Sequence, residues 1–444
     1  MLRSPLDQLH SSDPDLATQL KAIAAQLYNS NFEIQTPPMT PEQVGQQRLH
    51  LANQYQNLLD QARQLPGFED FLQPVKANKL VRAARNGPIV VINSHIDRCD
   101  ALFILPGHGD VGHLHLPNFT EKKAQNARSN LQILLNDMRL AERGVRRPLG
   151  QSADNDNFSS VLSTLWSDIV QPVLDYLGYL GNANASVKCL PHITWCPSGT
   201  LSFLPLHAAG DYGRSGSRIF DHVISSYTPT VTALLSSNSN SHGDSCRVLA
   251  IGQASTPGHN PLPGTVQEIA YVKAHTKQHA QYSQLLDNEA TTKSVLDAME
   301  RHDWVHLACH AHQNVDDPTK SGFYLHDGTL DLASINQRSF KSKGLAFLSA
   351  CQTATGDEKL PNEAIHLASG MLMAGYPSVI ATMWSVVDDD APLVADKVYA
   401  QLMKDGKVGN GEAGRALHDA VAVLRGKVGV DAFGRWVPYI HIGS

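Results

Sequence analysis

The chain has 444 residues, of which 42% are hydrophobic and 18% are charged. This length leaves room for roughly two to four domains, and the composition is that of a globular protein, not of a disordered one. Lys and Arg number 36 and Asp and Glu number 42, which gives a formal net charge of −6 without a long run of either sign. The charge balance argues against nucleic acid or an anionic membrane as the partner and favours proteins or small molecules.

The N-terminal residues and the cysteines bear on location and cofactors. The first residues, Met1–Asp7, contain no apolar core of a secretion signal, and no uninterrupted apolar stretch of about 18 residues follows. Neither secretion nor membrane spanning is predicted, and we expect a cytoplasmic protein. The six cysteines show no CxxC pairing and no zinc-finger spacing. Free thiols are therefore expected, with no metal and no other cofactor.

Residues 1–85 are predicted to form helices. Asp13-Pro14 is a cap followed by proline at the first helical position, and apolar residues recur at helix spacing after it. Thr40-Pro41 repeats this signature, and the pattern continues until Pro66-Gly67. Two amphipathic helices cannot bury both of their apolar faces alone. We expect them to pack on the rest of the chain or on upstream repeats, or to bind a regulatory protein partner.

From Asn86 onwards, short apolar runs alternate with helical stretches. The predicted strands are Ile89–Ile92, Ala101–Leu105, His192–Cys196, Leu201–Leu204, Ile219–Tyr227, Val248–Ile251, Trp304–Cys309, Phe323–Leu325, Leu345–Ala350, Ser378–Met383 and Trp436–Ile442. The Ser- and Asn-rich stretch 236–245 is expected to be a linker. Strands that alternate with helices indicate an α/β fold with a mostly parallel sheet covered on both faces, whose ligands bind beyond the carboxyl ends of the strands.

Two strand ends carry residues that could perform chemistry, namely His310 after Trp304–Cys309 and Cys351 after Leu345–Ala350. If these strands are neighbours, both side chains converge on one crevice. A thiol with a pKa of ~8.5 is only slightly ionised at neutral pH, so a nucleophilic cysteine needs a base such as an imidazole. His310 could take the thiol proton and later protonate the leaving amine. In the alternative interpretation, Cys351 is a small core residue and His310 a hydrogen-bonded strand-end histidine.

A metal site is the competing interpretation of the first strand end. His306, Cys309, His310 and His312 are all of types that bind metals. Strand alternation places the three histidines on one face and Cys309 on the other. A local four-ligand cluster cannot form in this way, and no metal site is predicted.

Several short motifs occur in a specific order after Asn86. They are Pro197-Ser198-Gly199, Leu204–Ala209, His306-Leu307-Ala308-Cys309-His310, Ser321–Leu330, Leu348–Ala354, Glu363 with Ala374-Gly375-Tyr376, Ala381–Asp388 and Trp436-Val437-Pro438. In this order and spacing they resemble the CHAT family of caspase-like domains, which are often fused to tetratricopeptide repeats and are related to separases and caspases. The resemblance implies a pseudo-caspase half without a catalytic pair at 86–240 and an active caspase-like half at 246–444. The helical segment at 1–85 is similar to the repeat-like or capping end that precedes such domains.

The resemblance also implies roles for individual residues. His310 matches the general base and Cys351 the nucleophile of a cysteine peptidase. The backbone N–H groups of Ala311 and Cys351 match the donors that hold the oxyanion in related peptidases. The family usually has glycine where this chain has Ala311. Alanine keeps the N–H group but disfavours positive φ, which bears on the efficiency of the site more than on its identity.

An acidic stretch follows the predicted strand Ser378–Met383, at the same carboxyl edge as Cys351. Its three consecutive carboxylates, at 388–390, usually indicate a solvated helix start. The stretch Trp384–Asp390 is also similar to an acidic segment of separases, which cleave after arginine. On this resemblance, Asp388 or Asp390 lines the substrate pocket and favours a basic residue before the scissile bond.

The leading hypothesis is a regulated caspase- or separase-like cysteine endopeptidase that acts on protein or peptide substrates. A role in cell-death or defence signalling rests on fold analogy alone. The second hypothesis is a catalytically silent CHAT scaffold that mediates protein–protein interaction. The third is a small-molecule hydrolase, which would turn over esters without needing a peptide.

Overall fold

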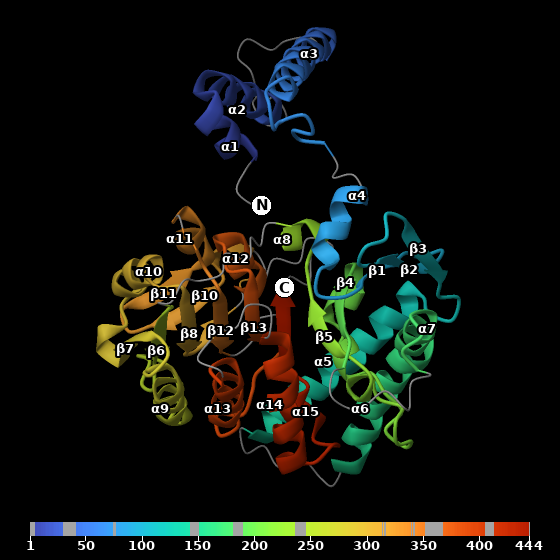
Figure 1. Ribbon diagram of the computed structural model, residues 1–444, viewed down its shortest axis with the longest axis vertical. Helices are drawn as coiled ribbons and strands as arrows, with labels where there is room; N and C mark the ends of the chain where they lie inside the picture. Colours follow the sequence, from blue (N-terminus) through green and yellow to red (C-terminus); the bar gives the residue numbers. More distant parts are fainter. Residues whose placement is uncertain are drawn as a thin grey trace. The chain divides into compact units, whose positions relative to one another are not determined.

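A computed structural model describes most of the chain (Figure 1). The described residues are 5–29, 41–73, 77–142, 151–180, 190–235, 246–312, 314, 317–338, 340, 342–350, 367–404 and 413–443. They belong to two compact units, Met1–Lys79 and Leu80–Ser444. The first unit is helical, and the second is built on a large sheet.

Each helix of the first unit begins at a proline. They are α1 (Pro5–Ser12), α2 (Pro14–Asn29) and α3 (Pro41–Arg63). The predicted starts at Pro14 and Pro41 are therefore confirmed. The Asp13 carboxylate accepts a hydrogen bond from the N–H of Leu16 at 3.0 Å, which caps α2. Buried side chains from all three helices form a core of this unit's own, with members that include Leu9, Leu20 and Leu58.

The second unit contains two sheets. The strands of the large sheet are β1 (Ile89–Ser94), β2 (Cys99–Ile104), β3 (Val111–His115), β4 (His192–Pro197), β5 (Ile224–Tyr227), β6 (Arg247–Gly252), β7 (Gln281–Leu286), β8 (Trp304–Ala308), β12 (Leu345–Ser349), β13 (Ser378–Thr382) and β14 (Tyr439–Gly443). Their order is β3-β2-β1-β4-β5-β14-β13-β12-β8-β6-β7. Neighbours are parallel except in the pairs β1–β2, β2–β3 and β13–β14. The small sheet has the order β11-β10-β9, from β9 (Ala311–His312), β10 (Gly322–Leu325) and β11 (Gly328–Asp331).

Helices cover both faces of the large sheet, as Figure 1 shows for the strands from β6 to β13. On one face α9 (Gly264–Thr276), α13 (Ala391–Leu402) and α14 (Ala413–Val428) pack side by side. On the other are α10 (Thr292–Arg301), α11 (Leu332–Gln337) and α12 (Leu367–Ala374). The remaining helices are α4 (Ala77–Leu80), α5 (Glu121–Glu142), α6 (Gln151–Leu165), α7 (Gln171–Tyr176), α8 (Val231–Leu235) and α15 (Phe433–Trp436). The predicted fold class, a mostly parallel sheet flanked by helices, is confirmed.

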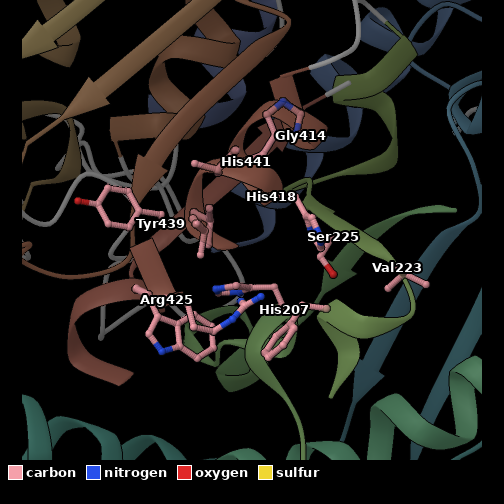
Figure 2. Close-up of a pocket in the computed structure, with 13 residues that line it drawn as sticks. His207, Val223, Ser225, Gly414, His418, Arg425, Tyr439 and His441 are labelled. Atoms are coloured by element: carbon pink, nitrogen blue, oxygen red, sulfur yellow. The ribbon is translucent and has the colours of Figure 1, made fainter. Parts of the chain in front are cut away.

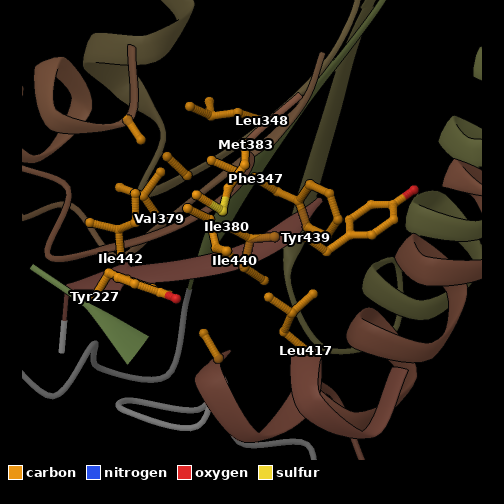
Figure 3. Close-up of a cluster of buried hydrophobic side chains, with 14 of the residues drawn as sticks. Tyr227, Phe347, Leu348, Val379, Ile380, Met383, Leu417, Tyr439, Ile440 and Ile442 are labelled. Carbon is orange, nitrogen blue, oxygen red and sulfur yellow. The ribbon is translucent and has the colours of Figure 1, made fainter. Parts of the chain in front are cut away.

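The C-terminal strand β14 joins the two groups of strands in the sheet. It runs antiparallel to β13 and parallel to β5, with Ile442 opposite Tyr227. Its buried side chains contribute to a core that β12, β13 and Leu417 of α14 also line (Figure 3). Strands before residue 240 and strands after residue 246 therefore share one sheet and one core. The division into a half at 86–240 and a half at 246–444 stays a prediction.

Several predicted strand boundaries are wrong. Leu201–Leu204 falls in a 3₁₀ helix at Gly199–Phe203, and the strand predicted from Ile219 begins only at Ile224. The last strand begins at Tyr439 because Phe433–Trp436 is helical. The edge strands β3 and β7 were not predicted. They alternate exposed and half-buried residues and so lack the continuous apolar run of a central strand.

Candidate functional site

The two strands that precede the candidate catalytic residues are neighbours. β8 and β12 pair in parallel, with Ala308 opposite Ser349. His310 follows β8 by two residues, at the carboxyl edge of the sheet where parallel strands present their ligand sites. Ala350 is the last described residue after β12, and its carbonyl accepts a hydrogen bond from Thr382 Oγ1 at 2.8 Å. Cys351 itself lies outside the described residues.

The half-buried imidazole of His310 is held by a backbone carbonyl. Its Nε2 lies 2.8 Å from the carbonyl oxygen of Asn260, in the loop between β6 and α9. A carbonyl oxygen only accepts hydrogen bonds, so Nε2 must carry a proton. In the neutral ring, Nδ1 is then the nitrogen with a free lone pair. The carbonyl of Asn260 thereby selects the tautomer of His310 in which Nδ1 can act as a base.

A series of ring contacts begins at His310. The ring of His259 stacks on His310 with 5.1 Å between centroids and 29° between planes. Tyr324 of β10 also lies against His259, with centroids 4.1 Å apart and planes tilted by 40°. His312 in turn stacks on Tyr324 at 4.8 Å. These rings come from the loop after β6, from β9 and from β10, so tertiary structure brings them together.

A tight turn positions His259 and Asn260. The N–H of His259 donates to the carbonyl of Thr256 at 3.1 Å, and Gly258 has a φ of +79°. Proline at the second position and glycine with positive φ at the third are typical of a type II turn. The N–H of Leu262 donates to the carbonyl of Ala254 at 2.9 Å and closes the loop. We did not predict a role for His259 or Asn260, although the Pro257-Gly258 pair, which four residues separate from a buried strand, is a visible turn signal.

Ala311 lies at the free edge of the small sheet. It pairs with Phe323, and the N–H of Tyr324 donates to the carbonyl of His310 at 2.8 Å. This pattern makes Ala311 and Phe323 a non-hydrogen-bonded pair, so the N–H of Ala311 points away from β10. Among the described residues, the non-glycine positions with positive φ are Leu72, Asp287 and Ser342. The expected difficulty of alanine with positive φ therefore does not arise at Ala311.

Asp388 lies beside the loop that holds His310. Its Oδ2 accepts a hydrogen bond from the N–H of Gly264, the first residue of α9, at 2.6 Å. Burial raises the pKa of this half-buried carboxyl, while the bond from Gly264 and the nearby His310 act in the opposite direction. A Cβ on Gly264 would come within 2.5 Å of the backbone oxygen of Asp388, so only glycine permits this approach. The Asp388 carboxylate thus lies close enough to His310 for the two groups to interact electrostatically.

Asp390 has a different environment. Its side chain is fully buried, and both carboxylate oxygens accept hydrogen bonds from Arg435, at 2.7 and 2.6 Å. The helix start expected for this stretch is confirmed, since α13 begins at Ala391 directly after Asp390, but the expected solvation is wrong for Asp390 and holds only for the exposed Asp389. Because Arg435 already neutralises it, Asp390 has no free charge for a substrate.

The remaining histidine and cysteine of the first strand end are internal. His306 is fully buried, and its Nε2 lies 3.1 Å from Oε1 of Glu268 on α9. Cys309 is also buried. Within the described ranges, no three His, Cys, Asp or Glu side chains are arranged to hold a metal ion. His306 and Cys309 are therefore residues of the protein interior.

A partly buried polar chain crosses the sheet where β14 is inserted. His192 Nε2 lies 2.6 Å from Ser226 Oγ, which lies 2.6 Å from His441 Nδ1. Nε2 of His441 lies 2.8 Å from Ser378 Oγ. These residues belong to four adjacent strands, β4, β5, β14 and β13, so this polar chain of side chains connects the two groups of strands.

A small cavity of about 40 Å³ adjoins the polar chain (Figure 2), with a lining that includes His207, His418, Arg425 and His441. None of the candidate catalytic residues lines this cavity.

The sequence of this chain matches a known family of protein domains. The model of the CHAT domain matches residues 159–444, which is more than half of the chain. The chain belongs to the CHAT domain family. The match includes β8, β12 and the acidic segment after β13. Among the described residues of this CHAT protein, no helix is both long and apolar enough to cross a membrane.

The CHAT chain is also similar to separases. A separin of Emericella nidulans is 37% identical over 87 residues, which are 18% of this chain and 4% of the separin. The structure of the Saccharomyces cerevisiae separase–securin complex superposes with a TM-score of 0.56 at 12% identity, over 83% of this chain and 31% of that one. The Arg-specific cysteine proteinase gingipain R gives a TM-score of 0.45 at 11% identity, over 62% of this chain and 68% of that one. The CHAT chain thus has a separase-like, caspase-like fold and spans about a third of the yeast separase chain.

Proposed function

We propose that this protein is a cysteine endopeptidase in which Cys351 is the nucleophile and His310 the general base. The observation that carries the proposal is the hydrogen bond from His310 Nε2 to Asn260, which leaves Nδ1 as the free base. The strand register supports it. Cys351 follows Ser349 by two residues, as His310 follows the paired Ala308 by two residues.

The proposed reaction proceeds through an acyl-enzyme. Nδ1 of His310 takes the proton of the Cys351 thiol, and the thiolate sulfur attacks the scissile carbonyl carbon. The N–H groups of Ala311 and Cys351 donate to the oxyanion of the tetrahedral intermediate. When the intermediate collapses, the C–N bond breaks and the imidazolium of His310 gives its proton to the leaving amine. Water, deprotonated by His310, then hydrolyses the thioester and restores the thiol.

We further propose a preference for a basic residue before the scissile bond. Asp388 supports it, since this carboxylate lies beside the loop that holds His310 and accepts a hydrogen bond from the uncharged N–H of Gly264. A charge-assisted hydrogen bond to Arg or Lys contributes roughly 1.5–3 kcal/mol, whereas an acidic side chain meets like charge. Asp390 is not included in this proposal because it is paired with Arg435.

We also propose the domain organisation that the resemblance to the CHAT family implies. Residues 246–444 would form the catalytic half and 86–240 a pseudo-caspase half without a catalytic pair. Residues 1–85 would pack on the body or bind a regulatory protein partner, and yeast separase is seen with securin as its partner. We expect the protein in the cytoplasm. Deleting residues 1–85 should change solubility or basal activity, and unchanged behaviour in both assays would leave them as a passive cap.

The decisive experiment is covalent labelling combined with cleavage profiling. A peptidyl electrophile should label the wild type and fail to label Cys351→Ala, while Cys309→Ala is the matched control, because Cys309 is a buried cysteine near the same edge. Peptide cleavage should disappear in Cys351→Ala and fall by at least ~10²-fold in His310→Ala. A protein that is not labelled selectively would be a silent scaffold. Turnover of simple esters without peptide cleavage would indicate a small-molecule hydrolase.

A further inference from the structure

We infer that His259 is a positioning residue that holds the ring plane of His310, and this inference rests on the dyad proposed above. The hydrogen bond to Asn260 fixes one atom, Nε2, at 2.8 Å. A ring that is anchored by its Cβ–Cγ bond and by one hydrogen bond at Nε2 can still turn about the line between these points, which would carry Nδ1 away from the nucleophile. A second contact on the face of the ring removes this freedom. His259 supplies that contact, with centroids 5.1 Å apart and planes 29° apart.

His259 can give this support because a second ring packs against it. The ring of Tyr324 lies 4.1 Å from its centroid on β10. The backbone N–H of the same tyrosine donates to the carbonyl of His310 at 2.8 Å. Tyr324 therefore fixes both the main chain of His310 and the ring that covers its side chain. The contacts of His259 with His310 and with Tyr324 thus link two segments whose main chains are also hydrogen-bonded.

The turn at 256–259 sets the distance between the two supports. His259 and Asn260 are consecutive, so one short segment provides the ring on the face and the carbonyl at the edge of His310. Gly258 adopts a φ of +79° and the N–H of His259 donates to Thr256, which fixes the direction in which the segment leaves the turn. A preorganised turn loses little entropy when it holds a catalytic group in place.

The charge state of His259 suits this role. Burial lowers its pKa, and the charge on His310 lowers it further. Both effects favour the neutral ring of His259, which adds no second positive charge beside His310.

The test compares His259→Ala, which removes the ring, with His259→Phe, which keeps a flat ring. His222→Ala is the matched control, because His222 also stacks on an aromatic ring, Trp166, and also bonds a carbonyl through Nε2. We expect His259→Ala to lower kcat by ~10- to 100-fold with KM within about twofold, since misplacing a catalytic group by about 1 Å can cost 10²-fold. His259→Phe should recover most of this loss, and His222→Ala should leave kcat unchanged.

A second measurement, the rate at which iodoacetamide alkylates Cys351, distinguishes a failure of the dyad from a failure of the role of His259. This rate reports how reactive the thiol is and needs no substrate. His310→Ala should slow alkylation, and His259→Ala should slow it in the same direction. If His310→Ala has no effect, the dyad and the role of His259 both fail. If His310→Ala slows alkylation but His259→Ala does not, the dyad stands and the role of His259 is refuted. Equal loss in His259→Phe and His259→Ala would also refute support by the ring face.

Discussion

The polar chain across the sheet should make the stability of the second unit depend on pH. His441 is 2% exposed, and its two ring nitrogens lie beside Ser226 and Ser378. Burial, and to a smaller extent the neighbouring His192, lower the pKa of His441 to about 3. The same ring in the unfolded chain has a pKa of about 6.5. The folded protein therefore needs a neutral imidazole at this position.

The sign and size of the effect follow from these two values. Between pH 6.5 and pH 3 the unfolded chain binds a proton that the folded chain does not, so acid favours unfolding. The contribution of His441 to stability is complete above pH 6.5 and is lost as the pH falls towards 3. A pH of 5 lies about 1.5 units below the pKa of the ring in the unfolded chain. At 1.36 kcal/mol per unit, this lowers the free energy of unfolding by about 2 kcal/mol.

The assay is urea unfolding at pH 7.5 and pH 5.0 of the wild type and of His441→Gln, in which the amide can still donate to one serine and accept from the other. The wild type should lose about 2 kcal/mol more between the two pH values than the variant, whatever the substitution costs at pH 7.5. His95→Gln is the control, because the His95 side chain is 62% exposed. Equal losses in the wild type and His441→Gln would refute the reasoning.

Three further outcomes are expected. Asp388→Asn should weaken the preference for Arg or Lys in a cleavage-site profile and leave the unfolding midpoint nearly unchanged; a dominant Asp or large aliphatic residue at that position in the wild type would contradict it. Asp390→Asn should leave specificity unchanged but lower stability by ~1–3 kcal/mol, because it breaks the buried pair with Arg435. Gly414→Ala should destabilise by ~1–3 kcal/mol, since its Cβ would lie 2.9 Å from Ser226 Oγ in the polar chain. Gly426→Ala in the same helix meets nothing within 4 Å and should stabilise by ~0.5–1 kcal/mol; equal effects in both would refute the packing argument.

Local chemistry was enough to predict part of this protein. Proline at the first helical position predicts the starts of α2 and α3, because its missing N–H and fixed φ suit only that end of a helix. Alternating strands and helices predict the parallel sheet, and the position of His310 after a buried strand places it at the carboxyl edge. Each of these inferences depends on a few consecutive residues, whose preferences are visible in the sequence.

The partners of the site residues were decided by tertiary structure. The base of the proposed dyad is oriented by a carbonyl of Asn260, and every residue type has a carbonyl, so the sequence indicates the turn at Pro257-Gly258 but not this contact. Asp388 and Asp390 are close in sequence and both acidic, yet Asp388 accepts a hydrogen bond from Gly264, whereas Asp390 is buried and paired with Arg435. The insertion of β14 between β5 and β13 likewise joins strands that are far apart in the chain. Hydrogen bonds and burial between distant segments form only when the whole sheet assembles, so residue type and spacing alone could not predict them.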